Sequence, residues 1–200
     1  MSLVVCGATL MYLILDCETT GLPKSRNETY KCLSNYDTCR MVSVAWLIYD
    51  KNYKIVSEKE YFITANNFSI PRSATKIHGI TKTVLNKKGK DFNMVMYKLA
   101  ADILEFQCKY FIGHNVYFDF NVLCSELHRN HHIKIINMLF TLEKYCTMVE
   151  GRRKLKLKSP PKLADLFKTI TKKPMVNNHN ALYDVRATAT IFKSLMSRAL

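Results

Sequence analysis

Acidic residues are scarce in this chain of 200 residues, where 16 Asp and Glu face 30 Lys and Arg. No apolar run reaches the roughly 20 residues that a membrane-spanning helix needs. The apolar start also lacks the basic region of a signal peptide. We find no internal repeat and no linker that would divide the chain. These absences lead us to expect one domain over residues 1–200 and no association with a membrane.

The formal net charge of +14 favours a polyanionic partner. Basic proteins of this size commonly bind nucleic acid, because phosphate groups attract Lys and Arg. A solvated, lysine-rich surface is the alternative. The densest basic stretch, residues 151–158, is a candidate for phosphate contacts, and a solvated loop is again the alternative. In so basic a chain, the position of each acid becomes informative.

The seven cysteines do not form a disulfide or zinc framework. Their number is odd, no C-x-x-C occurs, and several lie in apolar runs. This usage is typical of an intracellular protein in a reducing compartment, either the cytosol or the nucleus. The hydrophobic content of 48% is typical of a packed domain and not of a disordered chain.

Strand and helix patterns alternate along the chain after an initial hairpin. Short apolar or alternating runs predict strands at 11–16, 41–49, 54–63, 109–114 and 144–148. Helical spacing of apolar residues predicts helices at 91–107, 115–128, 162–170 and 181–196. We expect a loop with a short helical turn at 71–80, and the segment 133–148 is ambiguous apart from its last residues. The fold class is therefore α/β with a mixed sheet.

Two acids follow the apolar part of the first strand. Asp16 and Glu18 are two residues apart, so their side chains point to the same face of a strand. Two anions at a buried edge are costly unless a cation neutralises them, and Mg²⁺ or Mn²⁺ suits such hard oxygen ligands. The alternative is a strand that runs into a polar turn.

Two further aspartates occupy the starts of predicted helices. Asp119 lies four residues after Asn115, on the same helix face. An aspartate is also favoured electrostatically at a helix N-terminus, which is the structural alternative. Asp184 shares a face with Thr188 and Ile191, so it is expected to point inward.

Three motifs containing these acids occur in a characteristic order. They are Asp-x-Glu-Thr-Thr-Gly-Leu from Asp16, Gly-His-Asn-x-x-Phe-Asp from Gly113 and His-x-Ala-x-x-Asp from His179. Together they resemble the DEDDh branch of the DnaQ-like 3′–5′ exonucleases over residues 12–192. A fourth segment, residues 73–81, is similar to the substrate-side loop of that family.

The resemblance implies an RNase H-like fold, with helices flanking a five-stranded mixed sheet whose second strand is antiparallel. It implies that Asp16, Glu18, Asp119 and Asp184 bind two divalent ions, Mg²⁺ or Mn²⁺. Asp16 would contact both ions, Glu18 and Asp184 would complete the first, and Asp119 would act at the second. His179 would deprotonate the attacking water, a role for which histidine side chains are generally suited at neutral pH. Capping of the last helix is the alternative for His179.

The same resemblance implies a set of residues that hold the end of a strand. Leu22 and the segment around His78 would bracket the last bases, whereas Asn115 and Thr20 would hold the terminal sugar and phosphate. Phe118 is a candidate for base stacking or for the core. The full set is Thr19, Thr20, Leu22, Ile77, His78, Asn115 and Phe118. The segment between Leu22 and Met41 is longer than is usual in the family, and it is a candidate to cover or extend the nucleic-acid groove.

The resulting hypothesis is a metal-dependent exonuclease that removes nucleoside monophosphates from 3′ ends of single-stranded or frayed DNA. The segment His-Gly-Ile-Thr from His78 favours DNA. A 3′–5′ exoribonuclease of the same family is the first alternative. A nucleic-acid-binding module without catalysis is the second, and the presence of all five catalytic residues argues against it. A DNA polymerase or repair factor is the kind of protein partner that the family suggests.

Overall fold

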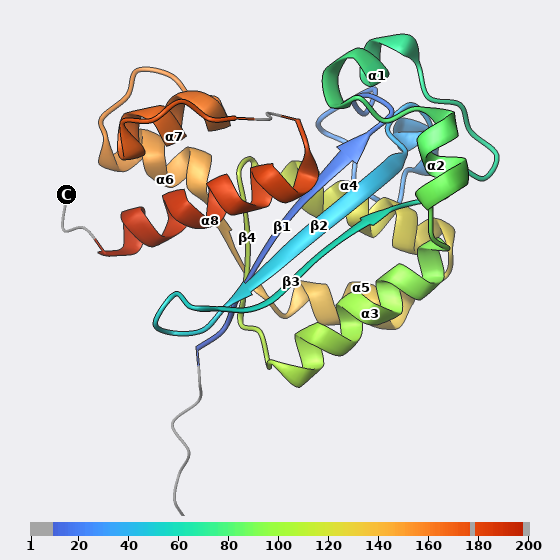
Figure 1. The fold of residues 1–200 in the computed structure, drawn as a ribbon. Coiled ribbons are helices and arrows are strands. Elements are labelled where there is room, and N and C mark those ends of the chain that lie inside the picture. The colour runs from blue at the N-terminus through green and yellow to red at the C-terminus, as the bar shows by residue number, and fades with distance from the viewer. Residues whose placement is uncertain (1–9, 177–178, 198–200) are drawn as a thin grey trace, which may run out of the picture.

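The computed structural model describes residues 10–176 and 179–197, in which helices cover both faces of a five-stranded sheet (Figure 1). The strand order is β3-β2-β1-β4-β5. The strands are β1 (Tyr12–Thr19), β2 (Met41–Tyr49), β3 (Ile55–Phe62), β4 (Tyr110–Gly113) and β5 (Glu143–Cys146). β2 is antiparallel to both of its neighbours, whereas β4 is parallel to β1 and to β5. The predicted mixed sheet with an antiparallel second strand is confirmed.

Alternation along β1 divides the core into two layers. Leu13 and Leu15 pack in the larger layer, with residues of α3 (Phe92–Glu105), α4 (Val116–Arg129) and α5 (Ile133–Phe140). Tyr12 and Ile14 pack on the opposite face against α8 (Ala181–Ser197). Because side chains two residues apart share a face, the next positions of the second series, Asp16 and Glu18, lie on the α8 side of the sheet.

Four further α-helices and the 3-10 helix η1 (Leu33–Tyr36) complete the part of the molecule that the structure describes. Beyond one end of the sheet, α1 (Arg72–His78) and α2 (Lys82–Lys88) follow β3, whereas α6 (Thr147–Lys154) and α7 (Leu163–Thr171) accompany α8 (Figure 1). Leu166 and Ile170 of α7 pack against Ile191 and Leu195 of α8. No helix in the ranges 10–176 and 179–197 is long and apolar enough to cross a bilayer.

Several predicted boundaries need correction. β1 continues to Thr19, so Asp16 and Glu18 lie within the strand and not at its end. The ambiguous segment 133–148 contains the helix α5 and then the strand β5. The fifth strand, predicted to end at residue 148, ends at Cys146, and residues 147 and 148 begin α6. Residues 71–80 contain the whole helix α1, which begins after Pro71 and ends at Gly79 with φ of 73°. A proline at the start and a left-handed glycine at the end are the signals for such a helix.

The cap of α4 also differs from the expectation. Asn115 occupies the N-cap position as predicted, but its backbone is left-handed, with φ of 70° and ψ of 47°. A capping side chain requires an extended backbone at this position, and Asn115 accordingly makes no side-chain capping bond. By contrast, Oγ1 of Thr81 caps α2 by accepting a hydrogen bond from the amide of Val84 at 3.2 Å.

Candidate active site

Three carboxylates meet where β1 lies against the start of α8. Asp16 and Glu18 come from β1, and Asp184 comes from the first turn of α8. One oxygen from each of these carboxylates lies within 4.8 Å of the others. The packing of Ala181 and Val185 with β1 residues in one apolar cluster fixes this approach. Residues far apart in sequence thus form one acidic cluster.

The charges in this cluster are not compensated. Burial, and then the nearby charges of Asp184 and Asp119, raise the pKa of Glu18 to about 8. Burial also raises the pKa of Asp184 to about 6 and, with three neighbouring acids, raises the pKa of Asp16 well above its usual range. Oδ1 of Asp184 is buried without a hydrogen-bond partner. Such a cluster is stabilised by a cation.

The donor set fits a divalent ion of the magnesium class. All three side chains offer carboxylate oxygens, the ligands that Mg²⁺ and Mn²⁺ prefer. The free, buried Oδ1 atom of Asp184 is a further unused ligand. Asp16, Glu18 and Asp184 therefore form the part of the predicted metal site that the structure brings together.

Asp119 approaches from the opposite layer. Its Oδ1 atom accepts hydrogen bonds from the backbone amide of Cys17 at 3.1 Å and from the Cys17 thiol at 3.3 Å. Burial raises the pKa of Asp119, and the two Cys17 donors lower it. The carboxylate of Asp119 is close enough to raise the pKa of Asp16, but it is not among the three that converge within 4.8 Å.

His179 lies in the turn before α8, as the sequence predicted. Its side chain is exposed, and its backbone is left-handed with φ of 64°. The backbone amide of His179 donates a hydrogen bond to Oδ2 of Asp184 at 3.2 Å. This contact ties the histidine to the acidic cluster through its main chain and leaves the imidazole available.

The predicted substrate-side segment borders the same site. Burial, and to a smaller extent the charge of His179, lower the pKa of His78 at the end of α1. Ile77 is exposed beside it. Thr19 donates to the carbonyl of Gly21 at 2.7 Å, and Thr20 donates to the carbonyl of Thr38 at 3.0 Å. A substrate role of both threonines stays a prediction.

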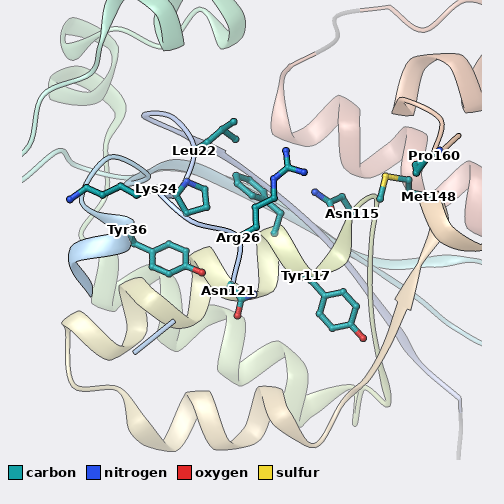
Figure 2. Close-up of a pocket in the computed structure, with 11 residues that line it drawn as sticks. Leu22, Lys24, Arg26, Tyr36, Asn115, Tyr117, Asn121, Met148 and Pro160 are labelled. Atoms are coloured by element: carbon teal, nitrogen blue, oxygen red, sulfur yellow. The ribbon is translucent and has the colours of Figure 1, made fainter. Parts of the chain in front are cut away.

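A cavity of about 530 Å³ contains the remaining predicted substrate residues, Leu22, Asn115 and Phe118 (Figure 2). It lies between the segment 23–40 and the first turns of α4, and it extends to α6 and to the segment before α7. Its other lining residues are Pro23, Lys24, Arg26, Tyr36, Tyr117, Asn121, Met148 and Pro160. Phe118 directly precedes Asp119 in α4, but none of the four acids lines the cavity.

Comparison with known proteins agrees with this arrangement. The sequence profile of the exonuclease family (RNase T) matches residues 13–192. The chain belongs to this family. The resemblance to an exonuclease family that the sequence motifs indicated is thereby confirmed. No curated protein sequence matches the chain significantly.

The structures of Escherichia coli exonuclease I share the fold. The complex with a dT13 oligonucleotide has a TM-score of 0.72 and 18% identity, covering 94% of this chain and 41% of that chain. The zinc-bound complex with single-stranded DNA has a TM-score of 0.70 and 20% identity, and the dA16 complex 0.66 and 20%. Each of these two covers 95% of this chain and 41% of the other. The chain thus spans about two fifths of the length of exonuclease I.

Some residues around the candidate site were missed by reasoning from sequence. The ring of His114 lies between Oγ1 of Thr147 and the carbonyl of Pro161, at 3.0 Å from each, and so joins α6 and the segment before α7 to the end of β4. The contact of Cys17 with Asp119 was also missed. The position of Cys17 between two acids was a usable signal, whereas nothing near His114 in sequence indicates Pro161.

Proposed function

We propose that this chain is a metal-dependent 3′–5′ exonuclease that removes nucleoside monophosphates from DNA by two-metal-ion hydrolysis. The observation that carries the proposal is the convergence of Asp16, Glu18 and Asp184 within 4.8 Å of one another. Their raised pKa values and the unpartnered oxygen of Asp184 support cation binding at this place. The excess of Lys and Arg supports a nucleic-acid substrate.

In this proposal the four acids bind the metal ions, and His179 accepts the proton of the attacking water. Asp16, Glu18 and Asp184 would bind one ion, and Asp119 with Asp16 would bind the second. Two bound divalent ions would stabilise the attacking and the leaving oxygen of an in-line displacement at phosphorus. Asp119 must be held in place for this role. The amide and the thiol of Cys17 hold it by donating hydrogen bonds to its Oδ1 atom.

His179 would act as the general base. One nitrogen of its exposed imidazole takes a proton from the attacking water as the water oxygen bonds to phosphorus. The bond from phosphorus to the 3′ oxygen of the upstream nucleotide breaks, and that oxygen receives a proton from solvent. The products are a nucleoside 5′-monophosphate and a strand shortened by one residue. The hydrogen bond from the main-chain amide of His179 to Asp184 supports this role, because it ties His179 to the acidic cluster.

DNA is the proposed substrate, and RNA is the second candidate. Exonuclease I of E. coli has been crystallised with the DNA oligonucleotides dT13 and dA16, and it shares the fold of this chain. The segment from His78 to Thr81 resembles that of DNA-trimming relatives, and the charge of His179 acts on His78. RNA-trimming members share the same acids, so the rates of hydrolysis of DNA and RNA distinguish the two candidates.

The test compares single-stranded DNA, duplex DNA and RNA of one sequence, with Mg²⁺ or Mn²⁺, and identifies products by mass. We expect nucleoside 5′-monophosphates, with DNA consumed faster than RNA. Asp184→Asn should abolish release. Asp165→Asn is the matched control, because Asp165 also lies in the first turn of a helix but is exposed. Faster hydrolysis of RNA would establish the alternative, and equal loss of activity in both variants would refute the acidic cluster.

A further inference from the structure

The segment 23–40 forms one wall of the cavity that Leu22, Asn115 and Phe118 also line. It contributes Pro23, Lys24, Arg26 and Tyr36, and α4 faces it with Tyr117 and Asn121. Figure 2 shows the side chain of Arg26 lying between Leu22 and Asn115 in that view. A volume of about 530 Å³ is within the range of small-molecule sites, and it suits a nucleotide.

Several hydrogen bonds hold this segment in one conformation. The buried side chain of Asn35 accepts from the amide of Ser25 at 2.7 Å and donates to the carbonyl of Ser25 at 3.0 Å. Oγ1 of Thr38 donates to the carbonyl of Leu22 at 2.9 Å. At the end of the segment, Arg40 forms two hydrogen bonds to the buried Glu126, at 2.6 and 3.2 Å. The cavity wall is therefore preformed, which reduces the entropic cost of binding.

The chemistry of the cavity matches a nucleic-acid strand. Lys24 and Arg26 are exposed and form no ion pair within the part of the chain that the structure describes. Tyr117 is 62% exposed although its ring is aromatic. Unpaired cations bind phosphate groups, and exposed aromatic rings stack on bases. The combination is typical of a channel for a single strand.

We propose that the segment 23–40 and α4 form a subsite for the nucleotides upstream of the 3′-terminal one. Lys24 and Arg26 contact phosphates of the strand, and Tyr117 stacks on a base. The strand passes from the acidic cluster beside Leu22 into this cavity. The inference rests on the proposed exonuclease function and adds a specific consequence, which is that turnover improves with the length of the single strand.

The first experiment separates the subsite from the acidic cluster. Substrates are the p-nitrophenyl ester of thymidine 5′-monophosphate, which engages the cluster alone, a dinucleotide, and an oligothymidylate of about 12 residues. In the wild type, kcat/KM should rise with length. The ratio between the longest substrate and the ester should fall about tenfold or more in the double variant Lys24→Ala/Arg26→Ala. The control is Lys51→Ala/Lys54→Ala, which removes two exposed lysines from the hairpin between β2 and β3.

The second experiment measures binding without catalysis, by fluorescence anisotropy of the oligothymidylate in EDTA at several salt concentrations. Losing two phosphate contacts should flatten the slope of log Kd against log salt by about 1.4, since each contact on a single strand accounts for about 0.7. Tyr117→Ala should weaken binding about tenfold, and Tyr117→Phe should restore it. The hairpin control should keep the wild-type slope.

The outcomes distinguish this inference from the proposed function. If the wild type hydrolyses neither the ester nor the oligonucleotides, the exonuclease function fails, and the salt slope in EDTA still tests the subsite. If the wild type is active but the double variant keeps both the wild-type slope and the wild-type length dependence, the subsite is refuted and the function stands.

Discussion

Oδ1 of Asp119 accepts two hydrogen bonds from Cys17, one from its amide at 3.1 Å and one from its thiol at 3.3 Å. Cys17 lies between Asp16 and Glu18 but points to the other face of β1. β1 therefore carries Asp16 and Glu18 on one face. On its opposite face, Cys17 holds the carboxylate of Asp119 by two hydrogen bonds. The thiol bond lowers the pKa of Asp119, against the effect of burial.

The first prediction concerns this thiol. Cys17→Ala keeps the amide donor but removes the thiol, so Asp119 should retain its proton to a higher pH. A lost neutral hydrogen bond amounts to about 1 kcal/mol, and we expect about fivefold weaker binding of Mn²⁺ near neutral pH, measured by titration calorimetry. Cys17→Ser keeps a donor and should resemble the wild type. Wild-type affinity in Cys17→Ala would show that the thiol does not position Asp119.

The second prediction concerns stability without metal. The folded-state pKa values of Glu18 and Asp184, about 8 and about 6, lie above the values of unfolded carboxylates. The folded state thus binds more protons than the unfolded state between about pH 4 and pH 8, and the free energy of unfolding must fall as pH rises through this window. The melting temperature in EDTA should fall with rising pH, by about 2–4 °C for each kcal/mol lost.

Glu18→Gln isolates this effect. Glutamine cannot ionise, so the variant should lose part of the slope and should be more stable than the wild type in EDTA at the upper end of the window. Excess Mg²⁺ or Mn²⁺ should reverse the order, because only the wild type has the Glu18 carboxylate to bind the cation. The same slope in wild type and variant would contradict an uncompensated cluster.

The elements and most of the site could be predicted because their signals are local. The period of two in β1 places Asp16 beside Glu18, and helical spacing places Asp184 on the inner face of α8. The strand β2 begins and ends at the predicted residues, since its nine residues are all buried and apolar or small. Such patterns depend on neighbours in sequence alone.

What could not be predicted depends on contacts between distant segments. The bond from Cys17 to Asp119 joins residues 102 apart, and the ring of His114 reaches Pro161, 47 residues away. The course of the segment 23–40 is determined by Glu126 on α4, which binds Arg40 and the amide of Met41. The sequence pattern of a helix N-cap also does not predict the left-handed backbone of Asn115.

The third prediction concerns His179. His179→Asn removes the base but suits the left-handed backbone, because asparagine tolerates positive φ better than alanine does. The amide bond to Asp184 remains, so folding should be little affected. If His179 is the general base, kcat should fall about 10²–10⁴-fold with little change in KM.

Melting temperature and kcat must be measured on the same preparation. Oδ1 of Asn180, and not the side chain of His179, caps α8 by accepting a hydrogen bond from the amide of Tyr183 at 3.2 Å, so His179→Asn should keep the melting temperature of the wild type. A stable variant with unaltered kcat would remove the imidazole from the mechanism.

The most direct test of the account compares a single-stranded DNA circle with its linear form, which has a free 3′-hydroxyl and a 5′ label. With Mg²⁺ or Mn²⁺, the linear strand should shorten by one nucleotide at a time from its 3′ end, and the circle should stay closed. Neither Asp16→Asn nor the wild type in excess EDTA should release product. Rapid nicking of the circle, or full turnover in EDTA, would contradict a metal-dependent 3′–5′ exonuclease built on this cluster.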